Sequence, residues 1–119
     1  MKTILCYGDC NTWGYNPATG GRFSRDKRWT RVLVQELVDG YYVIEEGLNG
    51  RTSALSDPIE GPHKNGKEYL VPCLESHQPL DLVTIMLGTN DFKKRFSLSA
   101  FDIANGAGVL LDIVRRRGG

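Results

Sequence analysis

Three residues of this sequence have the types needed for nucleophilic chemistry on an acyl group. Cys10 offers a thiol, Gly50 offers an unobstructed backbone N–H, and Asn90 offers a side-chain amide. They lie in three polar, glycine-rich segments: GDCNTWG (residues 8–14), GLNGR (47–51) and GTND (88–91). A nucleophile accompanied by donors for a developing oxyanion is the arrangement that acyl transfer requires. If the segments meet in space, the sequence predicts an acyl-transfer site at residue 10.

Each of these segments directly follows a short apolar run. The runs cover residues 3–7, 41–44 with its continuation to 48, and 82–87. Short apolar runs of this kind are typical of strands that are buried on both faces of a parallel sheet. Ligands of open parallel sheets bind beyond the carboxyl ends of the strands. The three polar segments are therefore expected to share that edge.

Helical periodicity separates and follows the predicted strands. Apolar side chains recur at three- and four-residue spacing over residues 29–37, 69–77 and 103–114. Pro72 predicts either a late start or a kink in the second of these helices. Ser99 and Asp102 are spaced as in a capping box, which predicts the start of the third helix.

The predicted order β-α-β-α-β-α indicates a three-layer α/β fold with a parallel sheet and right-handed crossovers. A chain of 119 residues has the length of one domain. However, three parallel strands leave the edges of the sheet uncovered. Residues 1–119 are therefore expected to form the N-terminal part of a single, larger domain.

Composition excludes several classes of protein. Fifteen Lys and Arg against fourteen Asp and Glu leave a net charge of +1, which argues against binding to nucleic acid or to an anionic membrane. No apolar run approaches the roughly 20 residues that span a bilayer. Three cysteines without an export signal predict reduced thiols and a cytoplasmic location. No C-x-x-C pair or His/Cys cluster is present in the sequence, so neither a metal nor a cofactor is predicted.

The three polar segments, in this order, resemble the sequence blocks of the SGNH (GDSL-type) hydrolases, and within them the arylesterase and acyltransferase group. GDCNTWG resembles the first block, GDSxTxG. EEGLNGRT (45–52) resembles the second, whose oxyanion glycine corresponds to Gly50, and IMLGTND (85–91) resembles the third, whose oxyanion Asn corresponds to Asn90. The resemblance extends over essentially the whole chain. It implies a flavodoxin-like fold and the hydrolysis of small acyl esters, or acyl transfer to an alcohol in place of water.

The sequence departs from this family in two ways. Cys10 stands where the family has its nucleophilic Ser, although the residues around it fit a Ser enzyme. A thiol is a good nucleophile, but its sulfur is larger than the hydroxyl oxygen. The D-x-x-H block that carries the general base and its Asp is absent from the 119 residues. The resemblance therefore places both on a C-terminal segment, so the chain alone is expected to be inactive or weakly active.

The two histidines of the sequence are not predicted to replace the missing base. His63 falls in a Gly/Pro loop, where a solvated surface role is expected, and His77 ends the second helix, opposite the carboxyl ends of the strands. A hydrogen-bonded structural role fits His77 best. The uncovered sheet edge further predicts a homo-oligomer.

Other polar residues have structural interpretations beside functional ones. Asp9 is expected to hold its turn by accepting backbone N–H groups. Trp13 either lines an acyl pocket or packs beneath its loop. Arg51 either forms an ion pair with Asp57 or Glu60, or contacts substrate. Residues 45 and 46 are adjacent carboxylates that point to opposite faces of a strand, which excludes a paired-carboxylate site.

Two functions of other classes compete with ester hydrolysis. The first is a non-catalytic α/β fragment or pseudo-enzyme that only binds a partner or ligand. The second is a flavodoxin-like nucleotide or flavin binder. Residues 8–14 match neither G-x-G-x-x-G nor the Walker pattern, which disfavours the second.

Overall fold

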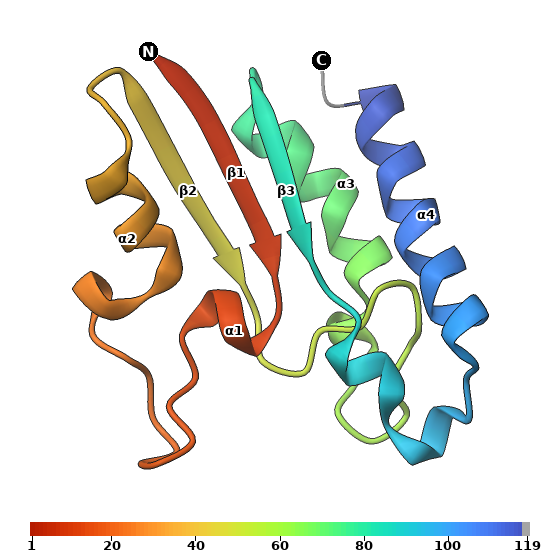
Figure 1. Cartoon of the computed structure of the whole chain (residues 1–119). Helices are drawn as coiled ribbons and strands as arrows, with labels where there is room; N and C mark the ends of the chain where they lie inside the picture. Colours follow the sequence, from red (N-terminus) through yellow and green to blue (C-terminus); the bar gives the residue numbers. More distant parts are fainter. Residues whose placement is uncertain (118–119) are drawn as a thin grey trace.

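The computed structural model describes residues 1–117, which form a parallel three-stranded sheet with helices on both faces (Figure 1). The strands are β1 (Lys2–Gly8), β2 (Tyr41–Gly47) and β3 (Leu82–Met86), in the order β2-β1-β3. The predicted α/β class and all three strands are confirmed. β2 ends at Gly47, one residue before the end of the predicted strand, and its polar continuation pairs with β1.

The register aligns the carboxyl ends of all three strands. Gly8 of β1 lies opposite Gly47 of β2 on one side and opposite Met86 of β3 on the other. The three polar segments therefore leave the sheet at the same edge, as the sequence predicts.

Three longer helices cover the sheet. They are α2 (Trp29–Glu36), α3 (Gly66–His77) and α4 (Ala100–Arg117). The shorter helices are α1 (Cys10–Trp13) and the 3-10 turns η1 (Arg25–Lys27), η2 (Pro62–Lys64), η3 (Thr89–Phe92) and η4 (Lys94–Phe96). α2 lies on one side of the sheet, and α3 and α4 lie on the other (Figure 1).

Successive side chains of β1 pack into two separate hydrophobic cores, one on each face of the sheet. Leu5 and Tyr7 point to the α3 and α4 side, where they are buried with Leu70, Leu74 and Leu110. Ile4, Cys6 and Val43 form the smaller core, against which Trp29, Leu33, Val34 and Leu37 pack. This alternation on the central strand fixes which face of the sheet each helix covers.

Two local predictions about the helices have different outcomes. The capping box is confirmed, since Ser99 Oγ accepts a hydrogen bond from Asp102 N at 3.1 Å and Asp102 Oδ2 accepts one from Ser99 N at 3.4 Å. The late start of α3 is wrong, because α3 begins six residues before Pro72 and continues through it. Its start is fixed by Asn65, whose side chain accepts a hydrogen bond from Lys67 N.

β3 forms the outer edge of the sheet within the described residues, where it pairs with β1 alone. Large apolar side chains are exposed on β3 and α4: Leu82, Met86, Phe101, Val109 and Leu111. Leu82 and Met86 lie on the α2 side of the sheet, because Leu82 pairs with Ile4, whereas α4 lies on the other side. We call these five exposed residues together the outer face. No helix among residues 1–117 is both long enough and apolar enough to span a membrane.

Candidate active site

α1 holds Cys10 at the carboxyl end of β1. The Asp9 carboxylate caps this single helical turn by accepting a hydrogen bond from Asn11 N at 3.2 Å, and Gly14 ends the turn in the left-handed region. The loop-holding role predicted for Asp9 is thus confirmed. The segment forms the short helix α1. Cys10 is its first residue, so its own N–H has no intrahelical acceptor.

The end of β2 packs tightly against this turn. A Cβ added to Gly47 would lie 2.3 Å from the backbone nitrogen of Trp13, which only glycine allows. The Trp13 ring lies outside the cavity at Cys10, and the Arg22 guanidinium lies 4.6 Å from its centroid. Of the two interpretations of Trp13, packing against its own loop is the one that the structure supports.

The loop after β2 aims a backbone donor at the sulfur. Gly50 N donates a hydrogen bond to Cys10 Sγ at 3.4 Å, across 40 residues of sequence. Gly50 has φ +78°, a left-handed conformation that L side chains rarely adopt. A Cβ at this position would also meet the Glu60 carboxylate at 2.7 Å. Both constraints favour glycine as the residue that presents this N–H.

The loop after β3 adds the side-chain amide. Asn90 is only 9% exposed, and its Nδ2 donates a hydrogen bond to the Arg51 carbonyl oxygen at 3.1 Å. An amide nitrogen carries two hydrogens, so one is left for another acceptor. Asn90 lines a cavity of about 190 Å³ together with Cys10 and Gly50. The structure therefore brings all three predicted residues to one cavity.

Four further residues line this cavity and were not predicted from the sequence: Tyr15, Asn49, Glu60 and Lys93. Their positions depend on loop conformations that no periodicity reveals. The side-chain oxygen of Asn49 is buried and accepts no hydrogen bond from the described residues.

A comparison with protein families matches residues 6–118 to the GDSL-like lipase/acylhydrolase family. The chain belongs to this family. The resemblance seen in the three polar segments is thereby confirmed over nearly the whole chain. No curated protein matches the chain.

Solved structures of esterases share the fold of this GDSL-like chain. The inhibitor-bound aryl esterase of M. smegmatis is 51% identical, with a TM-score of 0.92, over 96% of this chain and 54% of that one. A carbohydrate acetylesterase family member from Sinorhizobium meliloti is 44% identical, with a TM-score of 0.93, over 98% of this chain and 55% of that one. The SGNH-hydrolase family esterase AlinE4, at 21% identity and a TM-score of 0.72, shares the fold. The chain thus spans about half the length of these relatives.

Arg51 holds the second block of the GDSL-like chain in place. It is buried, and its Nη1 donates hydrogen bonds to the carbonyl oxygens of Gly8 at 3.1 Å and Glu46 at 2.7 Å. Its guanidinium carbon lies 4.3 Å from the centroid of the Tyr7 ring. Of the two interpretations of Arg51, the ion pair with Asp57 or Glu60 is not found, because its guanidinium contacts the ends of two strands and an aromatic ring. Contact with substrate stays a prediction.

An ion-pair cluster joins the loops after β2 and β3. Asp57 and Glu60 come from the first loop, and Lys93 and Arg95 come from the second. Arg95 Nε donates to Asp57 Oδ1 at 3.0 Å, and its Nη2 donates to the second Asp57 oxygen. These hydrogen bonds to Arg95 lower the pKa of the Asp57 carboxyl well below its ordinary value. Two members of the cluster, Glu60 and Lys93, line the cavity at Cys10.

Two buried carboxylates near Cys10 accept hydrogen bonds from backbone N–H groups of the loops. Asp91 Oδ1 accepts a hydrogen bond from Ser53 N at 3.0 Å, which joins the third segment to the second. Burial raises the pKa of Asp9, although its hydrogen bond from Asn11 N acts in the opposite direction. Both carboxylates therefore position the backbone around the cavity.

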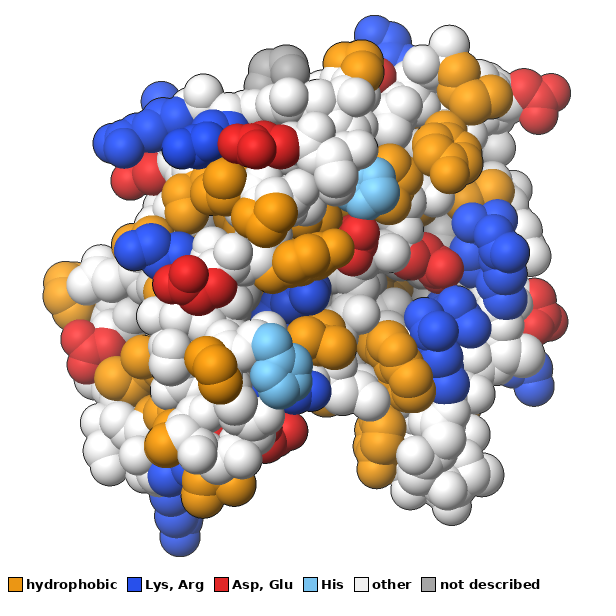
Figure 2. Space-filling view, turned by 180° about the vertical axis from the view of Figure 1, so that it is seen from behind, with side chains coloured by type: hydrophobic (Ala, Val, Ile, Leu, Met, Phe, Trp, Pro, Cys, Tyr) orange, Lys and Arg blue, Asp and Glu red, His pale blue; other side chains and the backbone are white. Residues whose placement is uncertain are grey.

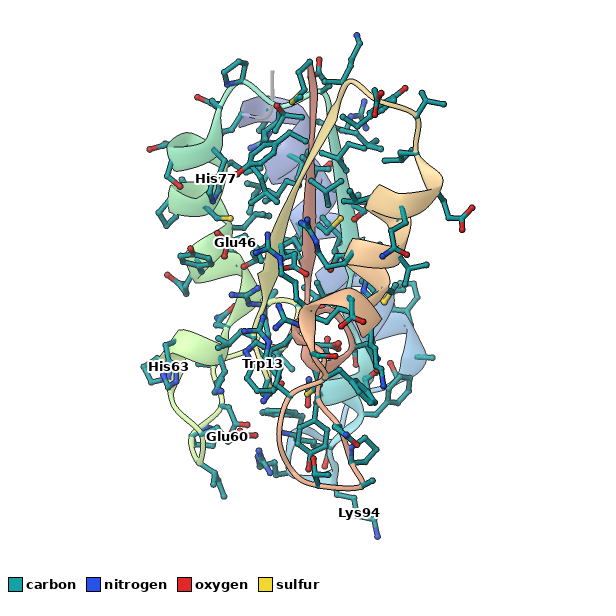
Figure 3. All side chains as sticks on the ribbon, turned by 90° about the vertical axis from the view of Figure 1, so that its left-hand side faces the viewer. Trp13, Glu46, Glu60, His63, His77 and Lys94 are labelled. Atoms are coloured by element: carbon teal, nitrogen blue, oxygen red, sulfur yellow. The ribbon has the colours of Figure 1, made fainter. Side chains whose placement is uncertain are left out.

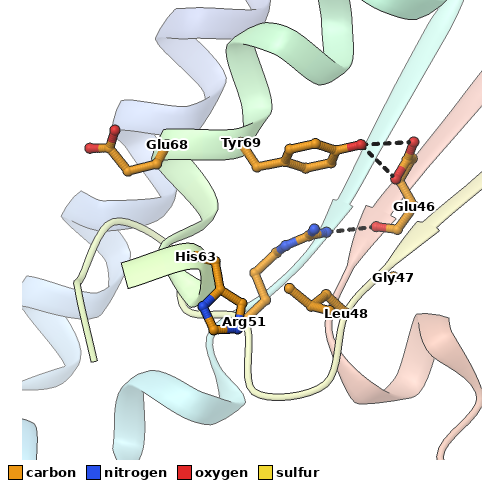
Figure 4. A pocket seen from close by; sticks show the side chains of 7 residues that line it. All are labelled: Glu46, Gly47, Leu48, Arg51, His63, Glu68 and Tyr69. Carbon is orange, nitrogen blue, oxygen red and sulfur yellow. Dashed lines mark hydrogen bonds between the residues drawn. The ribbon is translucent and has the colours of Figure 1, made fainter. Parts of the chain in front are cut away.

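Neither histidine lines the cavity at Cys10. Both lie on the α3 side of the molecule, away from α1 (Figure 3). Histidine side chains are visible on the face of the molecule that Figure 2 shows. His63 lines a second, larger cavity of about 470 Å³ that does not include Cys10, Gly50 or Asn90 (Figure 4). His77 Nε2 lies 2.8 Å from Glu46 Oε2, which confirms the hydrogen-bonded role predicted for it. Within the described residues, the cavity at Cys10 thus contains a nucleophile and donors but no imidazole.

Proposed function

We propose that this chain supplies the nucleophile and the oxyanion donors of a carboxylester hydrolase that acts on small acyl esters. The observation that carries the proposal is the hydrogen bond from Gly50 N to Cys10 Sγ, in the same cavity that Asn90 lines. A donor that reaches the nucleophilic atom also lies close to the carbonyl that this atom attacks. Membership of the GDSL-like family supports the reaction class.

The proposed reaction begins with attack of residue 10 on the ester carbonyl. A bond forms between sulfur and the carbonyl carbon, the thiol proton leaves to a base, and the carbonyl oxygen gains negative charge. The N–H groups of residue 10 and Gly50 and the amide of Asn90 stabilise that charge. The C–O bond then breaks, and the alcohol leaves with a proton. Water or another alcohol then attacks the thioester carbonyl and gives up its proton to the base. The C–S bond breaks, the acid or a new ester is released, and the sulfur takes back a proton to regenerate the thiol.

The general base and its Asp are proposed to come from a C-terminal segment. Two observations support this segment as the partner of the chain. The related esterase structures are almost twice as long as this chain, and the outer face exposes apolar side chains beside the unpaired edge of β3. Association of copies of the chain into a homo-oligomer is proposed on the same grounds, since an uncovered edge favours pairing.

A small acyl group fits the cavity. Its volume of about 190 Å³ suits a chain of few carbons, and Glu60 and Lys93 make one side polar. The relatives are named as an aryl esterase and a carbohydrate acetylesterase, which supports acetyl esters as first substrates to try.

The direct experiment is acetylation of the chain with an activated acetyl ester, followed by intact and peptide mass spectrometry. We expect one acetyl group on Cys10 and none in the Cys10→Ala variant. Asn90→Ala is expected to slow acetylation by about 10²–10³-fold, as measured when one oxyanion donor is removed from other enzymes. Equal rates in the unmodified chain and in Asn90→Ala would contradict the proposal. That result would favour the non-catalytic fragment instead.

A further inference from the structure

We propose that Glu46, Cys73 and His77 form a binding site for a divalent, thiophilic transition-metal ion, with Zn²⁺ as the first ion to test. The three side chains offer one carboxylate oxygen, one sulfur and one imidazole nitrogen, and these atoms all lie within 4.8 Å of one another. This set of O, S and N ligands is one that Zn²⁺ accepts. The proposal is independent of the reaction at Cys10.

The backbone presents the three ligands from two elements. Cys73 and His77 are four residues apart on α3, so they lie on the same face of the helix one turn apart. Glu46 lies near the carboxyl end of β2, and its side chain extends toward α3 (Figure 3). A bound ion would therefore connect α3 to the sheet.

The distances suit a metal ion with small adjustments. Ligand atoms of a tetrahedral zinc site are roughly 3.3–3.8 Å apart, given metal–ligand distances of about 2.0–2.3 Å. Here His77 Nε2 and Glu46 Oε2 are 2.8 Å apart, and no pair in the group exceeds 4.8 Å. Side-chain movements of about 1 Å would bring all three atoms to that spacing.

The surroundings orient the ligands and leave one side open. Tyr69 Oη donates to the Glu46 carboxylate, at 3.3 Å from one oxygen and 3.4 Å from the other, which resembles the outer-shell hydrogen bonds of known metal sites. Glu46 and Tyr69 also line the larger cavity of about 470 Å³ (Figure 4). The His77 side chain is 28% exposed, so an ion can approach from solvent and retain water as a fourth ligand.

Charge and proton balance favour a divalent cation. On binding, the sulfur–metal bond replaces the S–H bond and the proton leaves to solvent. A dication then neutralises one thiolate and one carboxylate. The neutral imidazole of His77 supplies the third ligand without adding charge.

Sequence analysis missed this group because its members are not adjacent in the chain. Cys73 and His77 alone form an ordinary helical pair, and Glu46 joins them only through the packing of α3 on the sheet. The prediction of no metal site followed from the absence of a local Cys/His cluster in the sequence.

Titration of the metal-free, reduced 119-residue chain with Zn²⁺ and with Co²⁺ tests the proposal. We expect one ion per chain, and with Co²⁺ a near-ultraviolet thiolate-to-metal absorption band. Cys73→Ser should abolish the band, while Cys6→Ser and Cys10→Ser should retain it. His77→Gln and Glu46→Gln should each weaken Zn²⁺ binding at least tenfold, whereas His63→Gln should not.

Several results would overturn the proposal. One is the lack of a Co²⁺–thiolate band in the unmodified chain. Another is a band that disappears with Cys10→Ser rather than with Cys73→Ser. A third is unchanged Zn²⁺ affinity in His77→Gln, which is informative even if Cys73→Ser fails to fold, because His77 is partly exposed and far easier to replace. Circular dichroism of each variant establishes that it is folded.

Discussion

The loops around Cys10 and the outer face of β3 and α4 are built in opposite ways. Around Cys10, buried polar groups form hydrogen bonds between the loops: Asp91 with Ser53 N, Asn90 with the Arg51 carbonyl, and Arg51 with two strand ends. On the outer face, apolar side chains such as Phe101 and Leu111 are exposed.

This difference between the two regions distinguishes two requirements of the proposed reaction, which are stabilisation of the oxyanion and a general base. Hydrogen bonds between the three loops fix the positions of Gly50 N and Asn90, so the donors at Cys10 are arranged by contacts within this chain. An exposed apolar face next to an open strand indicates contacts that this chain does not supply. We infer that oxyanion stabilisation is built into these residues, while the general base depends on what covers the outer face.

The largest expected effect on stability distinguishes two neighbouring residues of α4, one in the core and one on the outer face. Leu110 is fully buried against β1 and α3, whereas Leu111 is 55% exposed. Leu110→Ala is expected to lower the free energy of unfolding by about 2–5 kcal/mol, because it leaves a cavity in the core. Leu111→Ala should change it by less than about 0.5 kcal/mol. Urea unfolding of the isolated chain measures both, and equal losses would show that α4 does not pack as described.

Removal of the Asn90 amide tests the loops around Cys10 through the rate of acetylation. Asn90→Ala is expected to slow acetylation of Cys10 by about 10²–10³-fold, because the developing oxyanion loses a donor. Leu111→Ala is the matched control and should acetylate at the rate of the unmodified chain. Stopped-flow release of the alcohol product measures both rates. Slow acetylation in both variants would point to a general loss of structure.

The Asp57–Arg95 pair predicts a pH dependence of stability. The pKa of Asp57 is lowered by its hydrogen bonds to Arg95, from an ordinary value of 3.8. Its contribution is therefore fully present above about pH 4 and is lost as the pH falls through the lowered pKa of the folded chain. Asp57→Asn should be less stable than the unmodified chain near neutral pH, and the difference should shrink in acid. A difference that stays constant with pH would exclude this carboxylate as the cause.

The start of α4 is expected to show the smallest effect. Ser99→Ala removes the cap that accepts a hydrogen bond from Asp102 N, which should cost about 1 kcal/mol of unfolding free energy. Ser97→Ala is a nearby control, since its hydroxyl donates to the Lys94 carbonyl outside α4. A loss in Ser97→Ala as large as that in Ser99→Ala would contradict the assignment of the cap.

The sequence predicted what local pattern and strand-end geometry determine. Cys10, Gly50 and Asn90 could be placed at one cavity because each follows a recognisable buried strand, and parallel strands end at one edge. The capping box at Ser99 was visible because its two members are three residues apart.

Other features could not be predicted from the sequence, because they depend on contacts between residues that are far apart in the chain. An ion pair of Arg51 with Asp57 or Glu60 was one of two alternatives, but packing of α3 over Tyr7 leaves its guanidinium among strand ends and aromatic rings. Asp57 pairs instead with Arg95, 38 residues later. Neither choice can be read from charge spacing, because the loops decide which opposite charges meet.

The crystal structure of the chain acetylated at Cys10 tests the central claim most directly. We predict that the acetyl carbonyl oxygen lies within hydrogen-bond distance, about 3 Å, of both Gly50 N and Asn90 Nδ2. A carbonyl oxygen turned toward solvent, away from both donors, would contradict the account.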